Sequence, residues 1–438
     1  MKILFFTPTA TASAIAGVSE QVVGALIEDD HRVTVVRCET PDELRQPGRE
    51  FGHPIIDWTD DEAVNKAHAE CDAAVFQIGD HYPFHAGAVH WLDVLSGLVC
   101  IHDFFLGNLY LGWHHATGRH DLHLVESLYG EQVSRRFFEA AARGGEAFVE
   151  FAAEGAPMTE WIGGMASGAI AHSGWGVPRL AAATPGHVAI TPLPFVRPLP
   201  ERREVRGRGE EDPLVLVTIG RANANKRLAQ VIEAIGRDSL LRRLVRYRHV
   251  GFAEPSMERE LGELARARGV DFTMVGHVDD AQLASALDEA HAASCLRYPA
   301  LEGASASLLD ALVVGLPTLV TDVGSYAELP ADVVIKIPPD EEIPALTAAL
   351  HLLVADPPKA ALMGRAGQDW AYRNADPHRY ARVLVDNLED SMRIAPVLRA
   401  MRRATGLLSE WQADRTVVRD EEFWGPLGIF SAVLDSER

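Results

Sequence analysis

The chain runs twice through the same alternation of short apolar runs and amphipathic stretches, and this alternation points to a parallel α/β architecture. The first round begins with ILFFT, continues through the small-residue loop PTATASAIAG and the stretch VSEQVVGALIEDD, and closes with HRVTVVRC. The stretch VSEQVVGALIEDD carries its apolar residues at helical spacing, and the flanking runs are rich in strand formers. A strand, a helix and a second strand form a β-α-β unit, whose crossover makes the two strands parallel.

A stretch rich in proline and mixed charge, residues 192–213, separates the first round from the second. Before it, we predict further strands at 73–76, 98–101, 169–171 and 188–190, with a mainly helical region at 104–167. After it come LVLVTIG, RLAQVIEAIGR, YRHVGF and SMERELGELARARG, then four more strand segments, FTMVG, AASCLR, PTLVTD and VVIKIP. The pattern predicts two tandem Rossmann-like doubly wound domains that face a cleft. We place them at residues 1–196 and 197–385, followed by a helical tail at 386–438.

Composition excludes several classes of partner. The chain has 41 basic and 62 acidic residues among 438, so its net charge is −21. This balance argues against a nucleic-acid partner and against broad docking on anionic lipid. The N-terminus MKILFFTPTA lacks the pattern of a signal peptide, and no run of about 18 apolar residues predicts a transmembrane segment. The four cysteines show no C-x-x-C spacing, so we expect buried thiols in a reducing, cytoplasmic setting.

Two cationic residues follow the first strand of the second domain. Arg221 and Lys226 lie in the loop of LVLVTIGRANANKRLAQVIEAIG, just before a predicted helix. Such a loop offers backbone N–H groups and a helix N-terminus to an anion, and a guanidinium and an ammonium would complete a diphosphate clamp. The alternative is a pair of solvated surface residues. The glycine pattern is not that of a Walker loop.

A second polar turn follows about eighty residues later, in YPALEGASASLLDALVVGLP. We expect Ser305 or Ser307 to cap a helix there, with the N–H groups near Ala304–Ala306 facing the cleft. Glu302 in the loop and Asp310 in the helix are suited to accept hydrogen bonds from sugar hydroxyls. The alternative is a capped helix with surface acids around it. Because both turns follow strands of one sheet, together they predict a site for a nucleotide sugar, which presents phosphates and hydroxyls.

The second turn continues as EGASASLLDALVVGLPTLVTDVGSYAELP, and this stretch resembles retaining glycosyltransferases of the GT-B fold, of the family-4 type. The residues in register with that family's motif are Glu302, Asp310, Gly315, Pro317, Asp322, Gly324 and Glu328. The segments IGR…NKR, VGHV, VCIHDF and the N-terminus also match. One key position departs from the pattern, since Asp310 stands where the family has Glu, one methylene longer.

The resemblance implies roles for individual residues. Arg221 and Lys226 would neutralise the donor diphosphate, Glu302 and His102 would contact the transferred sugar, and Asp310 would bind the nucleotide ribose. The loop around Gly17 would line the acceptor side and approach the phosphate. The full set expected at the donor is Gly17, Gly220, Gly276, Gly303, Ala304, Ser305, Ala306 and Asp310. The first domain would bind the acceptor, the second the nucleotide sugar, and the tail would return to the first domain. Without the resemblance, His102 would be read as a structural histidine.

The expected activity is transfer of a sugar from a nucleotide-diphosphate sugar to an acceptor hydroxyl, with retention and with the leaving phosphate helping to deprotonate the acceptor. No metal or cofactor is expected, because the chain has no Asp-x-Asp triplet and its histidines suggest no ligand set. The acceptor could be a carbohydrate, a lipid-linked glycan or a small molecule. Two alternatives stay open: a nucleotide-sugar 2-epimerase and a non-catalytic sugar-nucleotide-binding protein. The nucleotide base, the sugar, the linkage and the oligomeric state are open as well.

Overall fold

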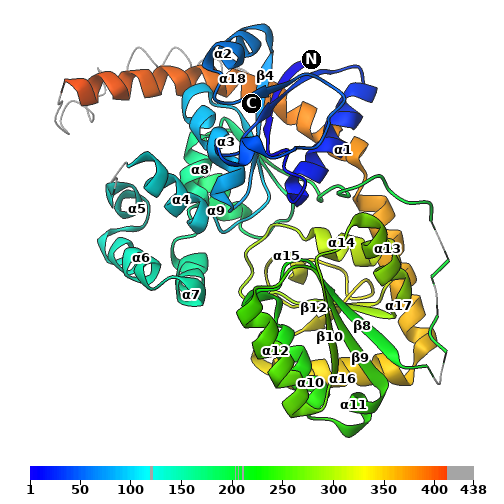
Figure 1. Cartoon of the computed structure of the whole chain (residues 1–438). Coiled ribbons are helices and arrows are strands. Elements are labelled where there is room, and N and C mark those ends of the chain that lie inside the picture. The colour runs from blue at the N-terminus through cyan, green and yellow to red at the C-terminus, as the bar shows by residue number, and fades with distance from the viewer. Residues whose placement is uncertain (119–121, 203, 206, 210–211, 412–438) are drawn as a thin grey trace.

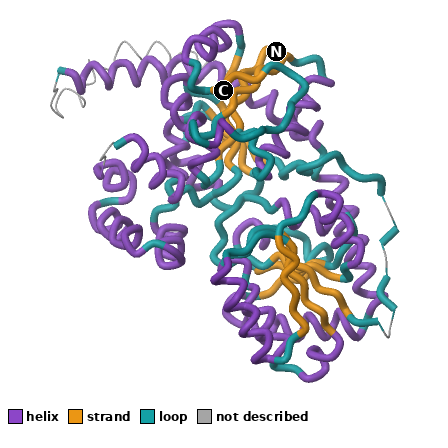
Figure 2. Tube along the Cα trace, in the orientation of Figure 1, coloured by secondary structure: helices purple, strands orange, loops and turns teal. Residues whose placement is uncertain are grey.

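The computed structural model describes residues 1–118, 122–202, 204–205, 207–209 and 212–411. It contains two parallel sheets, each flanked by helices, and Figures 1 and 2 show them as two lobes joined through a narrow middle region. The predicted α/β architecture of two doubly wound domains is therefore confirmed.

The N-terminal sheet has the strand order β3-β2-β1-β4-β5-β6-β7, and every pairing is parallel. Its strands are β1 (Lys2–Thr7), β2 (Arg32–Arg37), β3 (Ile55–Asp57), β4 (Ala73–Ile78), β5 (Leu98–Ile101), β6 (Gly168–Ala171) and β7 (Val188–Ile190). In the register, Ile3 lies opposite Val33 on one side and Ala73 on the other. The sequence did not predict β3, a short edge strand of three largely solvent-accessible residues with no alternation to mark it.

Helices cover the N-terminal sheet, and a helical lobe projects from it between β5 and β6 (Figure 1). The helical segments are α1 (Ala14–Glu28), η1 (Glu43–Arg45), α2 (Asp61–Glu70), α3 (Tyr82–Leu95), α4 (Gly107–Thr117), α5 (Leu122–Tyr129), α6 (Glu131–Arg143), α7 (Gly145–Gly155), α8 (Thr159–Met165) and α9 (Val177–Ala183). The run from α4 to α8 confirms the mainly helical region predicted at 104–167.

The C-terminal sheet has the order β10-β9-β8-β11-β12-β13. Its strands are β8 (Leu214–Ile219), β9 (Val245–Val250), β10 (Asp271–Gly276), β11 (Ala292–Cys295), β12 (Thr318–Thr321) and β13 (Ile335–Ile337). Its helical segments are η2 (Ala224–Lys226), α10 (Leu228–Gly236), α11 (Ser239–Leu244), α12 (Pro255–Arg268), α13 (Asp280–Glu289), α14 (Ala306–Val313), α15 (Gly324–Ala327), η3 (Pro339–Glu341), α16 (Glu342–Ala355) and α17 (Pro357–Asn374). The six strands predicted after the break are all present.

The last described helix, α18 (Pro377–Glu410), crosses back to the N-terminal domain and packs on α1 and β6. It reaches that domain before the predicted boundary at 386, because His378 already lies 3.3 Å from Glu28. The part of the predicted tail from 412 to 438 lies outside the described residues. None of the described helices is both long and apolar enough to cross a membrane.

Gly17 marks where the linker meets the first domain, and here the sequence prediction is wrong. The predicted loop runs through Gly17, but α1 already begins at Ala14, where the side chain of Ser13 caps it. A Cβ atom at position 17 would lie 2.6 Å from the carbonyl oxygen of Val196. Gly17 therefore allows α1 to pack closely against the linker, and it does not lie in a loop that approaches a ligand.

Candidate functional site

A cavity of about 470 Å³ lies between the two domains. The N-terminal domain contributes Asp80, His81, Asp103, Phe105 and Asn108 to its wall, and the C-terminal domain contributes Arg221, Asn223, Asn225, Lys226, Arg297, Leu301, Glu302, Ser305, Ala306 and Ser307. These residues follow the carboxyl ends of parallel strands, where open α/β sheets bind ligands. We call this cavity the cationic pocket. It brings together Arg221 and Lys226, which the sequence placed in one turn, and Glu302, which it placed in another.

Of the two predicted cations, Lys226 is buried and Arg221 is exposed. The side chain of Asn223 caps η2 and accepts a hydrogen bond from the backbone N–H of Lys226 at 3.1 Å, while Lys226 Nζ donates to the carbonyl of Ile219. Gly220 makes room for the ammonium, since a Cβ atom there would lie 2.5 Å from Nζ. Burial, and then the nearby charge of Arg297, lower the pKa of Lys226 to about 7. An anion in the pocket would restore the charged form.

Arg221 lies at the rim of the pocket. Its side chain is 65% exposed and forms an ion pair of 2.7 Å with Glu254. The guanidinium also lies over the ring of Phe252, 5.0 Å from the ring centre. Because exposed ion pairs are weak and easily exchanged, Arg221 can turn towards a bound anion at little cost.

Arg297 is a buried cation of this pocket that the sequence analysis did not single out. It comes two residues after β11, and its guanidinium donates from Nε to Glu302 at 3.0 Å and from Nη2 to the hydroxyl of Ser307 at 3.0 Å. Nη1 donates to the carbonyl of Leu296 at 2.8 Å. One signal could have found it: in the sequence AASCLRYP, a charged residue closes an apolar run, and a guanidinium buried there needs a function or a partner.

Glu302 is held in place from one side. Its Oε1 atom accepts hydrogen bonds from Arg297 and from the hydroxyl of Tyr326, and its backbone carbonyl accepts from Ser325 at 3.2 Å. Among the described residues, no group bonds to the second carboxylate oxygen. The carboxylate therefore has a fixed orientation and one oxygen to offer to a ligand hydroxyl.

The N-terminus of α14 completes the pocket. Ser305, one of the two residues predicted to cap this helix, is the N-cap, and its hydroxyl accepts from the backbone N–H of Leu308 at 3.4 Å. Ser305, Ala306 and Ser307 line the pocket, so the positive end of the helix dipole faces it. Gly303 lies outside the pocket wall, and its N–H donates to the carbonyl of His102 at 2.8 Å.

His102 lies in the wall of a neighbouring cavity of about 250 Å³, which Ala304 and Ala306 also line. Its Nε2 is 2.6 Å from the amide oxygen of Gln77, and its Nδ1 is 3.3 Å from Nε2 of His172. Burial, followed by the neighbouring His172, holds the pKa of His102 well below its usual value. The ring is therefore neutral, and both of its nitrogens are already engaged within the N-terminal domain.

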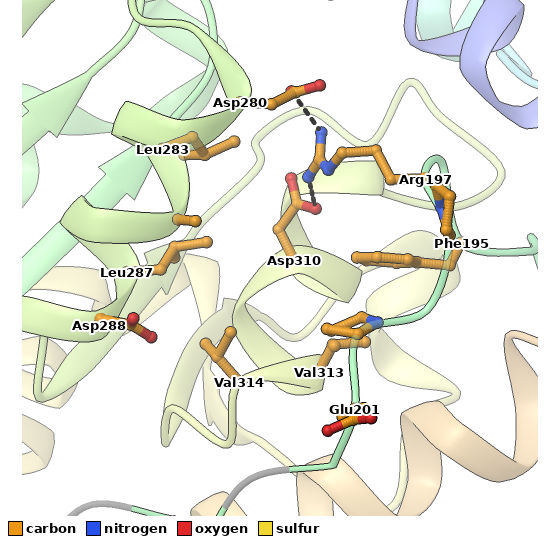
Figure 3. A pocket seen from close by; sticks show the side chains of 13 residues that line it. Phe195, Arg197, Glu201, Asp280, Leu283, Leu287, Asp288, Asp310, Val313 and Val314 are labelled. Atoms are coloured by element: carbon orange, nitrogen blue, oxygen red, sulfur yellow. Dashed lines mark hydrogen bonds and ion pairs between the residues drawn. The ribbon is translucent and has the colours of Figure 1, made fainter.

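Asp310 faces a third cavity, of about 230 Å³, between α13, α14 and the linker. Figure 3 shows Arg197 of the linker lying between Asp280 and Asp310. Arg197 donates to Asp310 and lies 3.4 Å from Asp280. Burial raises the pKa of Asp310 to about 6, although Arg197 opposes this shift. The carboxylate predicted to bind ribose is thus paired with the linker and does not line the cationic pocket.

Gly276 ends β10 with a positive φ of 84°, and its carbonyl accepts from the N–H of Gly251 at 2.9 Å. It lines none of the three cavities described above. In the described part of the chain, no group of three or more His, Cys, Asp or Glu side chains could hold a metal ion.

Comparison with known proteins gives a match to one protein family and a set of similar solved structures. Residues 201–370 match the family described as Glycosyl transferases group 1, and this range contains every C-terminal residue of the cationic pocket. A comparison with curated protein sequences gave no match.

Solved structures with the same architecture cover nearly the whole chain. HepE of Anabaena, solved in complex with UDP and glucose, superposes with a TM-score of 0.56 at 15% identity over 89% of this chain and 99% of its own. Sucrose-phosphate synthase of Thermosynechococcus elongatus gives 0.60 at 16% identity, with coverages of 88% and 98%. WaaG, a glycosyltransferase involved in lipopolysaccharide biosynthesis, gives 0.52 at 15% identity, with coverages of 88% and 99%. The chain shares the two-domain GT-B fold with these structures, and its residues 201–370 match the group 1 family.

Proposed function

We propose that this chain transfers a sugar from a nucleotide-diphosphate sugar to the hydroxyl group of an acceptor. The observation that carries the proposal is the convergence of Lys226, Arg297 and the N-terminus of α14 on one cavity between the domains. Two buried cations and a helix N-terminus favour a doubly charged anion. The match of residues 201–370 to a glycosyltransferase family supports the same reading.

The chemistry follows from where charge develops. As the bond between the sugar and the phosphate breaks, negative charge grows on the departing diphosphate and the sugar becomes cation-like. Lys226, Arg297 and, from the rim, Arg221 would stabilise the departing charge more than the ground state, and this difference accelerates the reaction. Glu302, fixed by Arg297 and Tyr326, would accept a hydrogen bond from a sugar hydroxyl.

The finer features of the reaction are proposals of the same kind. We propose that no metal is required, because the side chains of the pocket and the helix dipole supply the positive charge that a diphosphate needs. Retention of configuration rests on the resemblance of the Glu302-to-Glu328 stretch to retaining enzymes. HepE was solved with UDP and glucose, so UDP-glucose is the first donor to test. A cytoplasmic location remains a prediction from the cysteines and the composition.

The direct test is turnover of a panel of UDP- and GDP-sugars, with and without acceptors. Transfer or slow hydrolysis of one donor by the wild-type chain, reduced about 10²–10³-fold in Lys226→Ala or Arg297→Gln, supports the proposal. Arg243→Ala, on the exposed face of α11, is the matched control and should keep the wild-type rate. An epimerised sugar nucleotide formed without acceptor would identify a 2-epimerase. Binding without any turnover would identify a non-catalytic binding protein.

A further inference from the structure

A short backbone pairing joins the two domains beside the cationic pocket. Segment 102–105 of the N-terminal domain and segment 301–303 of the C-terminal domain share three backbone hydrogen bonds of 2.7, 2.8 and 2.9 Å. Asp103 and Glu302 form an isolated antiparallel bridge there. Residues directly opposite each other in an antiparallel pair carry their side chains on the same face, with Cβ atoms about 4.5–5.5 Å apart. The two carboxylates, one from each domain, therefore lie side by side.

The two carboxylates differ in their partners. Glu302 is paired with the guanidinium of Arg297 at 3.0 Å. Asp103 accepts one hydrogen bond through Oδ2, from the backbone N–H of Asp80 at 2.8 Å, and forms no ion pair with any described residue. Burial, and then repulsion by Glu302, raise the pKa of Asp103 to about 7. A carboxyl group with such a pKa exchanges a proton readily near neutral pH.

Asp80, the other acid on this wall, is already engaged. Its Oδ1 accepts from the backbone N–H groups of Asn108 and Leu109 at the start of α4, at 2.8 and 3.0 Å, and its Oδ2 accepts from the side-chain amide of Asn108 at 2.6 Å. Asp80 therefore serves to cap α4. Of the two acids that the N-terminal domain places in the pocket, Asp103 is the one with an oxygen to offer.

Asp103 also lies where two cavities meet. It lines the cationic pocket and the neighbouring cavity of about 250 Å³, whose wall includes the segment 12–15 at the start of α1, together with Phe84 and Leu193. A donor sugar held at Glu302 and a second molecule in the neighbouring cavity would face each other across this position.

We propose that Asp103 is a catalytic residue that accepts the proton of the acceptor hydroxyl, and that the acceptor enters through the cavity beside α1. This assignment rests on the proposed glycosyl transfer and deepens it. In the step, the bond from the sugar carbon to the phosphate oxygen breaks and its electron pair stays on the diphosphate. The acceptor oxygen forms the new bond to the sugar carbon, and its proton passes to the Asp103 carboxylate. Asp103 thus takes the proton that the resemblance assigned to the leaving phosphate.

Other groups that titrate or carry charge surround this position and have to be separated from Asp103 by mutation. They are Asp80, His81, His85 and His102 from the N-terminal domain, and Arg221, Lys226, Arg297 and Glu302 from the C-terminal domain. Burial lowers the pKa of His85 to about 3, so this ring stays neutral in the relevant range. Two groups are most easily confused with Asp103: Lys226, with a pKa of about 7, and Asp80, whose pKa burial raises well above its usual value.

The experiment is the pH profile of donor hydrolysis, with water as the acceptor, for the sugar nucleotide that the wild-type chain cleaves best. At saturating donor, which keeps Lys226 charged, we expect the wild-type rate to rise as pH increases through about 7 and then to level off. Asp103→Asn should lower the rate by about 10²–10⁴-fold and remove this rise, while leaving the dissociation constant for the nucleoside diphosphate within about threefold. Asp103→Glu, which keeps a carboxylate, should recover part of the rate together with the pH dependence.

Asp332→Asn, in an exposed turn of the C-terminal domain, is the control and should keep the wild-type rate and profile. Equal melting temperatures for the two Asp103 variants and the wild type exclude misfolding as the cause of a loss. A wild-type rate and profile in Asp103→Asn would overturn the assignment and return the proton to the leaving phosphate, with the proposed transfer intact. A wild-type chain that binds and cleaves no sugar nucleotide would overturn the proposed function and this assignment together.

Discussion

Lys226 and Arg297 are two buried cations that face one cavity, and burying their charges costs free energy. Burial lowers the pKa of Lys226 to about 7, and its ammonium forms no ion pair with any described residue. Removing a charge from water costs several kcal/mol unless a partner compensates. A bound diphosphate would supply that partner, so the free protein keeps an electrostatic deficit that the ligand relieves.

The first prediction concerns the pH dependence of nucleotide binding. A diphosphate favours the charged ammonium, so the pKa of Lys226 should be higher in the complex than its value of about 7 in the free protein. The affinity for the nucleoside diphosphate should then be highest below pH 7 and fall as pH rises above it, by up to about tenfold per pH unit. Calorimetric titration at pH 7, 8 and 9 measures this. Lys226→Gln should bind weakly and with little dependence on pH; a dependence identical to that of the wild type would contradict the role of Lys226.

The second prediction ranks the arginines of the pocket. Arg297 touches both Glu302 and Ser307 from a buried position, whereas the side chain of Arg221 is 65% exposed. Arg297→Lys removes the forked contact with its two partners but keeps the charge, so we expect turnover to fall about 10²-fold. Arg221→Lys should lose less than about tenfold. Steady-state rates with one donor decide the ranking, and the reverse order would show that the rim arginine carries the main contact.

At the level of elements, α14 combines a structural and an electrostatic task in its first turn. Its N-cap, Ser305, faces the pocket and satisfies the backbone N–H of Leu308. The same turn is held from β11 by Arg297, through the hydroxyl of Ser307. Fold and binding site are therefore built from the same residues here, and substitutions have to be chosen to separate the two effects.

The third prediction makes that separation at Ser305. Ser305→Ala removes the cap and should lower the free energy of unfolding by about 1 kcal/mol. Ser305→Asp keeps a good cap, so its stability should stay close to that of the wild type. The added negative charge at the helix N-terminus should nevertheless repel a diphosphate and weaken its binding at least about tenfold. Denaturant unfolding and nucleotide titration on both variants test this, and tight binding by Ser305→Asp would place the diphosphate elsewhere.

Elements with a strong period were predictable from the sequence, while contacts between distant segments were not. The strands of both sheets except β3, most of α1 and a cap at Ser305 or Ser307 follow from apolar spacing and local chemistry. The edge strand β3 was missed because only three residues of it pair with β2. The positions of Gly17 against Val196 and of Asp310 against Arg197 depend on how the linker packs, which no local pattern records. Arg297 was missed because a single arginine after a strand carries no periodicity.

Across the whole molecule, the linker is docked on the C-terminal domain, and the two domains meet at the pocket. Arg197 of the linker pairs with Asp310 and Asp280, and the backbone of Phe195 donates to the carbonyl of Ala375 at 3.0 Å. Glu328 of the C-terminal domain accepts from the N–H of Gly174 of the other domain at 2.8 Å. A motion that separates the two domains would therefore have to break the contact between Glu328 and Gly174.

The fourth prediction tests the linker contact through stability. Arg197→Gln leaves the carboxylate of Asp310 buried without its cation and should cost on the order of 3 kcal/mol at neutral pH. The folded-state pKa of Asp310, about 6, lies above its usual 3.8, so ionisation of this group opposes folding. The protonated carboxyl of Asp310 contributes to the free energy of unfolding below pH 3.8, and this contribution is lost as pH rises through about 6. The loss of stability in Arg197→Gln should therefore be larger at pH 7.5 than at pH 5.

The compensating variant is Arg197→Gln combined with Asp310→Asn, which removes the uncompensated charge. Most of the lost stability should return in this double variant, and denaturant unfolding of the two single variants and the double variant gives the coupling between the residues. Additive losses would show that the ion pair seen in Figure 3 contributes nothing to the fold.

The central claim is that the pocket between the domains binds the diphosphate of a nucleotide sugar through Lys226, Arg297 and the start of α14. The most direct measurement is the shift of the unfolding free energy of the wild type, Lys226→Gln and Arg297→Gln by nucleoside diphosphates. At one hundred times its dissociation constant, the preferred nucleotide should stabilise the wild type by about 2.7 kcal/mol. At the same concentration it should stabilise the two variants by less than about 1.5 kcal/mol, if each loses tenfold or more in affinity. Equal stabilisation of all three proteins, or of none by any nucleotide, would contradict the claim.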